Sequence, residues 1–134
     1  MKSKKSAWGE AGQKRRVVLD TNFLLIPYEN KLDVFAEIRK LLGEVEFMIP
    51  EPVIRELHLI AGKNTGAKVA LELLEGRQFT AVGSDCSADE AVVGIAEEYG
   101  AYVASMDAKV RRRARGKNLK LVTLRGGDRI ILRD

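Results

Sequence analysis

The chain has 134 residues, a length that predicts one domain, because two separate hydrophobic cores would each be small. With 46% hydrophobic residues, 31% charged residues and a net charge of +4, its composition excludes disorder over the whole chain. A single cysteine and a single histidine exclude an intramolecular disulfide and a Cys/His zinc site, so any metal must be held by oxygen.

The first 15 residues are basic and rich in Lys, Ser, Gly and Gln, which is typical of a flexible tail before a domain over residues 16–134. This start lacks the apolar stretch of a signal peptide, and no apolar run in the chain approaches the roughly 20 residues of a membrane helix. We therefore expect a cytoplasmic protein with no membrane partner.

The next elements alternate between strand and helix. Residues 16–20 form a short apolar run that predicts a buried strand, and the spacing of apolar residues over 33–42 predicts a helix. A second strand follows at 46–49, and two prolines then open a helix over 50–60.

The second half of the chain continues this alternation. Apolar spacing predicts a helix over 67–74 and a strand over 78–82, and the capping box Ser87 to Glu90 predicts the start of a helix over 87–99. The remaining elements are a strand (101–105), a short basic helix (107–115), a strand (120–124), a glycine turn (126–127) and a final extended piece (129–132).

Strands that alternate with helices indicate the α/β class, with a mainly parallel sheet covered on both faces. Functional sites in such folds lie beyond the carboxyl ends of the strands, near the point where the strand order reverses. Asp20 and Asp107 follow two predicted strands, Asp89 opens the helix at residues 87–99, and Glu56 lies in the second turn of its helix. We expect these four carboxylates to converge at one edge of the sheet.

Each of the four acids has an ordinary structural explanation when taken alone, as a turn residue, a helix cap or a solvated side chain. Together they form a set that stability does not require, and like charges at close range repel unless a cation joins them. Hard oxygen ligands favour Mg²⁺ or Mn²⁺. The set therefore predicts a divalent metal site.

The net charge is unevenly distributed along the chain. Residues 1–16 carry +5, residues 17–106 carry −8 and residues 107–134 carry +7. An acidic centre between cationic ends suits a protein that gathers carboxylates in one place and binds a polyanion with another.

Four motifs in order resemble those of PIN-domain ribonucleases: VVLDTNFLL, PEPVIREL, SADEAVVGIA and VASMD supply the four acids. The resemblance covers residues 16 to about 132. It implies a three-layer α/β/α domain with a central, mainly parallel five-stranded sheet of order 3-2-1-4-5. The segments DTNFLLIP, GKNTGAKVALELLE and LRGGDRIIL, with the arginines after the fourth acid, resemble the archaeal branch related to the small-subunit ribosomal RNA processing nuclease of eukaryotes.

The resemblance also implies an activity, namely Mg²⁺- or Mn²⁺-dependent hydrolysis of RNA phosphodiester bonds by an endoribonuclease. Its metal-binding and catalytic residues would be Asp20, Glu56, Asp89 and Asp107, with Asp20 and Asp107 as the innermost ligands. The side chains expected to hydrogen-bond the carboxylates and the scissile phosphate are Thr21, Asn22 and Ser105; those expected to bind RNA are Lys109, Arg111, Arg112, Arg113 and Arg115.

One position departs from the family pattern. PIN domains often carry Thr-Asn-Asp at the fourth acid, whereas this chain has Ser105-Met106-Asp107. The hydroxyl and the carboxylate are kept, and the departure puts in doubt one polar contact near the metal.

Ribosomal RNA processing is the preferred context, with a ribosomal precursor as the RNA and ribosome-assembly factors as partners. One alternative is the toxin ribonuclease of a toxin–antitoxin pair, with an antitoxin as partner; another is a catalytically silent RNA-binding module. A phosphoacceptor receiver domain also places acids at strand ends, but the positions of Glu56 and Asp89 do not suit it. PIN domains often dimerise, so a homodimer is a further expectation.

Overall fold

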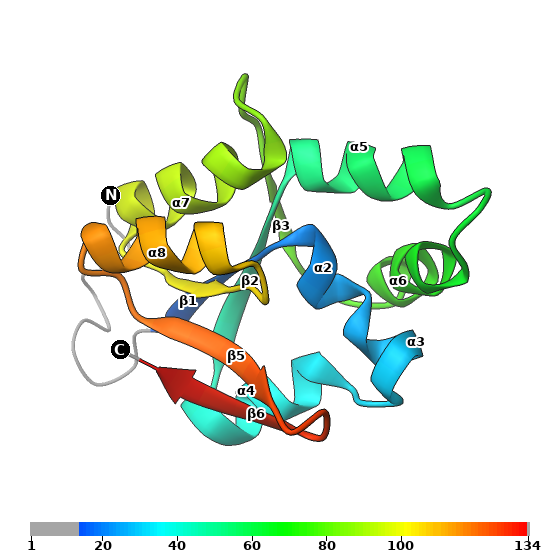
Figure 1. Cartoon of the computed structure of the whole chain (residues 1–134), viewed down its shortest axis with the longest axis horizontal. Coiled ribbons are helices and arrows are strands. Elements are labelled where there is room, and N and C mark those ends of the chain that lie inside the picture. The colour runs from blue at the N-terminus through cyan, green and yellow to red at the C-terminus, as the bar shows by residue number, and fades with distance from the viewer. Residues whose placement is uncertain (1–13, 134) are drawn as a thin grey trace.

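The computed structural model describes residues 14–133 (Figure 1). Of the tail predicted for residues 1–15, residues 1–13 lie outside the described part of the chain. The first strand begins at Arg15, one residue before the predicted start of the domain.

A six-stranded sheet forms the centre of the molecule, in the order β3-β2-β1-β4-β5-β6. The first five strands are parallel to their neighbours and confirm the predicted order, and β6 adds an antiparallel edge strand to the five that were expected. The strands are β1 (Arg15–Leu19), β2 (Val45–Pro50), β3 (Thr80–Val82), β4 (Tyr102–Ala104), β5 (Leu121–Arg125) and β6 (Arg129–Arg133).

The sixth strand follows from a tight turn. Gly126 and Gly127 have φ angles of +67° and +78°, a conformation that glycine adopts without the steric penalty of a side chain. The loop between the paired residues Arg125 and Arg129 has three residues, a length that is common in hairpins. The final extended piece therefore folds back onto β5, from the pair Arg125–Arg129 to the pair Leu121–Arg133.

Five of the helices were predicted. The structure adds two short ones directly after β1. Within residues 14–133, no helix has the length and hydropathy of a membrane-spanning segment. The helices are α2 (Thr21–Leu24), α3 (Ile26–Asn30), α4 (Val34–Leu42), α5 (Glu51–Ile60), α6 (Thr65–Glu75), α7 (Ala88–Tyr99) and α8 (Ala108–Gly116).

Helices cover both faces of the sheet and form a three-layer arrangement with it, as Figure 1 shows. On one face, α7 packs on β1, β2 and β4, and α8 packs on β5. On the other face, α4 packs on β6, and its Phe35 ring meets the edge of Phe47 of β2 at a centroid distance of 5.0 Å. The apolar core is built between these layers.

Polar side chains define where several helices begin. Ser87 accepts a hydrogen bond from the backbone N–H of Glu90 and donates one to the Glu90 carboxylate, which confirms the start of α7 that the capping box predicted. Asp33 caps α4 by accepting a hydrogen bond from the N–H of Ala36, and Asn64 caps α6 by accepting one from the N–H of Ala67. These caps set the helix starts within a residue of the predicted positions for α4 and α7.

The reversal of strand order lies between β1 and β4, which are hydrogen-bonded neighbours although most of the chain separates them. The pairing extends one residue past β1, since the N–H of Asp20 donates to the carbonyl of Ala104 at 3.0 Å. The chain segments that follow β1 and β4 therefore leave the sheet side by side. This is the edge at which a site is expected in an open α/β sheet.

Candidate active site

Asp20 occupies the junction between β1 and α2 and is only 3% exposed. One carboxylate oxygen accepts a hydrogen bond from the N–H of Thr21 at 2.8 Å, which caps α2. The other accepts from the hydroxyl of Ser105 at 2.7 Å. Ser105 follows β4, so this bond connects the ends of the two strands at the point where the strand order reverses.

Burial raises the pKa of Asp20 to about 6, because the ionised carboxylate loses its hydration. The hydrogen bonds from Ser105 and Thr21 act in the opposite direction, and the negative charges of Asp89 and Asp107 raise the pKa further. Both of those acids are therefore close enough for their charges to act on Asp20. The ionised form of this carboxylate would be stabilised by a cation at this edge.

Thr21 connects Asp20 with the second predicted acid. Its hydroxyl donates to a carboxylate oxygen of Glu56 at 2.6 Å, and this bond joins α2 to α5. Thr21 is buried, whereas Glu56 is exposed, so the bond holds one end of an otherwise solvated carboxylate.

Asp107 lies at the start of α8 and caps it. A single carboxylate oxygen, Oδ1, accepts hydrogen bonds from the N–H groups of Lys109 and Val110, at 2.8 and 3.1 Å. The backbone N–H of Asp107 donates to the hydroxyl of Ser105 at 3.0 Å. Ser105 therefore contacts both strand-end acids, and Oδ2 of Asp107 has no hydrogen-bond partner among the described residues.

Asp89, in the first turn of α7, is partly exposed. Together with Glu56 it lines a shallow groove between α5 and the start of α7. The four predicted acids thus surround the same edge of the sheet, on α5, α7, the end of β1 and the start of α8. Within residues 14–133, however, no three carboxylate, imidazole or thiol side chains are close enough together to form a metal-binding cluster.

The donor set nevertheless fits a small hard cation. Mg²⁺ is commonly bound through one or two carboxylates, with water completing its coordination. Each carboxylate oxygen has two acceptor sites, so the hydrogen bonds to Asp20 leave one site open on each oxygen. Asp20 and the open oxygen of Asp107 are the donors that this chemistry would use first.

Asn22 differs from the other predicted polar residues, because it bonds the backbone rather than a carboxylate. Its side-chain oxygen accepts from the N–H of Met106 at 3.2 Å and so ties α2 to the segment between β4 and α8. Met106, which replaces the usual asparagine, accepts at its sulfur from the Thr123 hydroxyl at 3.4 Å and from the Leu124 N–H at 3.3 Å. The thioether therefore supplies a contact to β5 at this position.

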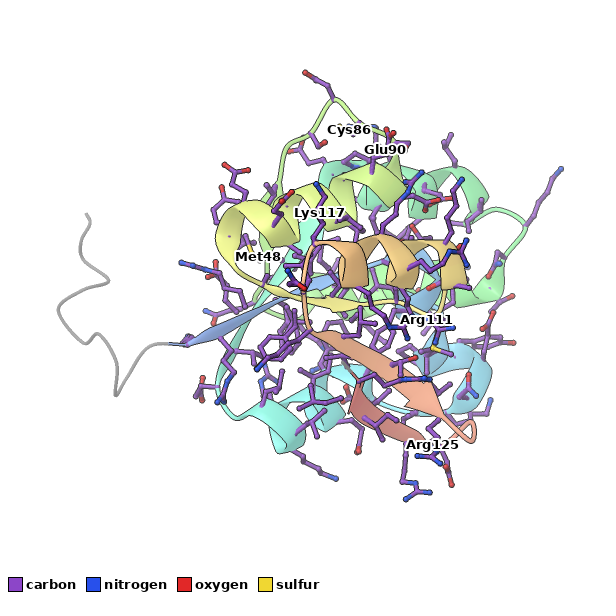
Figure 2. The ribbon with its side chains drawn as sticks, turned by 60° about the vertical axis from the view of Figure 1, so that its left-hand side comes forward. Met48, Cys86, Glu90, Arg111, Lys117 and Arg125 are labelled. Carbon is purple, nitrogen blue, oxygen red and sulfur yellow. The ribbon has the colours of Figure 1, made fainter. Side chains whose placement is uncertain are left out.

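The basic helix α8 presents its cations unequally. Lys109, Arg112 and Arg113 are exposed, and none of these three side chains has a hydrogen bond or ion pair with the described residues. Arg111 instead lies along β5, where its guanidinium donates to Thr123 at 3.4 Å and its Nε is buried without a partner (Figure 2). The fifth predicted RNA-binding residue, Arg115, is exposed near the end of the helix.

Comparisons with known proteins agree with this architecture. The family model described as PIN like domain matches residues 17–127. The ribonuclease VapC9 of Archaeoglobus fulgidus is 30% identical over 129 residues, which cover 92% of this chain and 93% of that protein.

Solved structures share the fold at lower sequence identity. The PIN domain endonuclease Utp24 superimposes with a TM-score of 0.76 at 20% identity, over 87% of this chain and 90% of that one. A domain of a functionally unknown protein from Methanocaldococcus jannaschii gives a TM-score of 0.62 at 16% identity, over 84% and 92%. VapBC2 from Rickettsia felis, solved bound to a DNA fragment from its promoter, gives 0.60 at 15% identity, over 82% and 99%.

Proposed function

Since the chain belongs to the PIN-like domain family, we propose that it is a divalent-metal-dependent endoribonuclease that hydrolyses phosphodiester bonds of RNA. The observation that carries this proposal is the buried carboxylate of Asp20. It lies at the point where the strand order reverses, and the negative charges of Asp89 and Asp107 raise its pKa. A buried acid surrounded by other acids lowers the stability of the folded chain, and it is useful where a cation is to be held.

Asp20 and Asp107 would hold Mg²⁺ or Mn²⁺ most directly, because both follow strands whose ends are connected through the Ser105 hydroxyl. When bound there, such an ion would supply the chemistry of water activation and charge neutralisation at the phosphate under attack. Asp89 would bind the ion directly or through water. Glu56, on a longer side chain, would orient the attacking water.

The neighbouring polar side chains would support these acids in different ways. Ser105 holds both strand-end acids, and Thr21 holds Glu56, so each restricts the orientation of a carboxylate. The side-chain amide nitrogen of Asn22 has no partner among the described residues and remains a donor for the scissile phosphate. Cations of α8 would bind the RNA backbone. Arg111 is half-buried, whereas the other cations of the helix are exposed, namely Lys109, Arg112, Arg113 and Arg115.

The direct test is cleavage of a labelled single-stranded RNA by the native chain and by Asp20→Asn, with Mg²⁺, with Mn²⁺ and with EDTA. The native chain should cleave with either metal and lose activity in EDTA, and Asp20→Asn should be inactive in all three. Undiminished cleavage by Asp20→Asn would refute the proposal. Binding of RNA without cleavage under any divalent metal would support the silent RNA-binding alternative.

Processing of a ribosomal RNA precursor in the cytoplasm, with assembly factors as partners, is the context that we favour. The segments that resemble the archaeal branch support it. The toxin alternative is supported by the 30% identity to the ribonuclease VapC9 and implies an antitoxin partner. Two observations separate these contexts. Enrichment of ribosomal precursors after crosslinking of Asp20→Asn to cellular RNA favours processing, and a small DNA-binding protein encoded by the neighbouring gene favours the toxin. Size measurement in solution tests the predicted homodimer.

A further inference from the structure

A shallow groove of about 390 Å³ runs between α5 and the start of α7. This volume lies within the range of roughly 300–1,000 Å³ that is usual for ligand sites. Figure 2 shows Cys86 in the loop that leads into α7, and this residue lines the groove. The groove is lined by Pro52, Arg55, Glu56 and Leu59 of α5 and by residues 86–89.

The α5 wall of the groove is a single stripe of the helix. Pro52, Arg55, Glu56 and Leu59 have the spacing i, i+3, i+4, i+7, which brings them onto one face. The core stripe of the same helix contains Val53 and Leu57, both fully buried. The groove-facing stripe is therefore not needed for packing α5 against the sheet, apart from Pro52, which is buried at the helix start.

Two side chains on this stripe are open to solvent. Leu59 is 84% exposed, and Arg55 is exposed without a hydrogen bond or ion pair to any described residue. The neighbouring carboxylate of Glu56 is bonded to Thr21 instead, so the guanidinium of Arg55 is unpaired. An unpaired guanidinium is well suited to a phosphate, which it can contact through two parallel hydrogen bonds.

The groove opens onto the proposed reaction centre. It contains Glu56, which is bonded to Thr21, and Asp89, whose charge acts on Asp20. The exposed cations of α8 follow Asp107, which comes from a different strand end. An RNA strand whose scissile phosphate lies at Asp20 would therefore have the cations of α8 nearby, and the groove with the unpaired Arg55 would lie beside it along α5.

We propose that the groove between α5 and α7 binds the RNA strand next to the scissile bond, with Arg55 binding a backbone phosphate and Leu59 contacting a base or ribose. This inference rests on the proposed ribonuclease activity. Apolar contact on one wall and a phosphate contact beside it are the elements by which proteins bind single-stranded nucleic acid with little sequence preference.

Cys86 allows a test that does not require catalysis, because it is the single cysteine of the chain, is exposed and lines the groove. The full chain is incubated in EDTA with a single-stranded oligoribonucleotide, and the rate of Cys86 alkylation by iodoacetamide is followed by mass spectrometry. Saturating RNA should slow the alkylation several-fold. A variant that combines Cys86→Ser with Leu59→Cys should show the same protection on the opposite wall.

Binding measured by fluorescence anisotropy tests Arg55 separately. Arg55→Gln should weaken RNA binding by at least about threefold and lower the slope of log K against log salt by about 0.7, as expected for the loss of one phosphate contact. Lys120→Gln removes the same charge from an exposed position before β5 and should leave both values unchanged.

The outcomes distinguish this inference from the proposed function. Tight RNA binding with unchanged alkylation of Cys86, or native affinity of Arg55→Gln, would overturn the groove assignment while metal-dependent cleavage by the same preparation stayed intact. Absence of both binding and cleavage would overturn the proposed function and the groove assignment with it.

Discussion

At the scale of single residues, Asp20 combines burial with two acidic neighbours, and its folded-state pKa of about 6 lies above the ordinary value of 3.8. Between these two pH values the folded chain keeps a proton that the unfolded chain has lost, so stability falls as the pH rises. The penalty is complete above pH 6 and amounts to about 3 kcal/mol.

Asp20→Asn should therefore be more stable than the native chain by about 3 kcal/mol at pH 8 in EDTA, and the difference should vanish near pH 4. Urea unfolding across this pH range measures it. Saturating Mg²⁺ or Mn²⁺ should stabilise the native chain and not the variant. Asp128→Asn changes an exposed acid in the β5–β6 turn and serves as the control; an equal pH-dependent gain in that variant would contradict the assignment to Asp20.

The sequence motifs located the acids, but they could not show all of their contacts. A strand followed by Asp20 is enough to predict a carboxylate at the sheet edge. The role of Met106 depends on Thr123 and Leu124, 17 and 18 residues later, and on how β5 lies beside β4. Contacts of this kind require the tertiary structure, as does the burial of the Nε atom of Arg111, whose side chain extends from α8 to Thr123 of β5.

At the scale of elements, α8 depends on an acid that is also proposed to bind metal. Asp107 accepts two backbone N–H bonds at the helix start, and asparagine caps helices about as well as aspartate does. The structural and catalytic contributions of Asp107 can therefore be separated by choosing the substitution.

Asp107→Asn should keep the stability of the native chain to within a few tenths of a kcal/mol, whereas Asp107→Ala should lose about 1 kcal/mol with the cap. Both variants should lose at least about 100-fold in RNA cleavage, because loss of a ligand costs no less than loss of a residue that orients one. Urea unfolding and a cleavage assay on the same preparations check this. Native activity in Asp107→Asn would remove Asp107 from the metal site.

Element boundaries were predictable where local signals were strong. The structure confirms α7, which was predicted from the capping box at Ser87 and the apolar stripe after it, and it confirms the glycine turn, while the antiparallel pairing of β6 with β5 was not predicted. The helices α2 and α3 were missed because they have four and five residues, too few for a helical period, and because Pro27 interrupts the apolar run. Their existence depends on capping by Asp20 and on packing against α6.

At the scale of the whole molecule, the uneven charge predicted a separation between acids and cations, and the fold brings them together at one edge. Asp89 and Asp107 lie close enough to act on Asp20, and α8 begins at Asp107 with most of its cations exposed. The alternation of strands and helices predicted the layers. The groove beside α5 could not be predicted, since it depends on how α5 lies against α7.

A variant that replaces Lys109, Arg112 and Arg113 with glutamine should lower the salt slope of RNA binding by up to about 2, at about 0.7 for each phosphate contact. Titrations in 50–200 mM salt measure this slope. A matched variant that replaces Lys40, Lys68 and Lys120 removes the same charge from α4, α6 and the segment before β5. If the two triple variants changed the slope equally, RNA binding would reflect net charge rather than the α8 surface.

The chemical groups at the product ends distinguish metal-dependent hydrolysis from attack by the RNA itself. Hydrolysis by an activated water with departure of the 3′ oxygen leaves a 5′-phosphate and a 3′-hydroxyl, whereas attack by the RNA 2′-hydroxyl leaves a 2′,3′-cyclic phosphate. Mass spectrometry of an oligoribonucleotide cleaved by the native chain in Mn²⁺ should show 5′-phosphate and 3′-hydroxyl ends, and none of these products should form in EDTA or with Asp20→Asn. Cyclic phosphate ends, or the same products from Asp20→Asn, would contradict metal-dependent hydrolysis at Asp20.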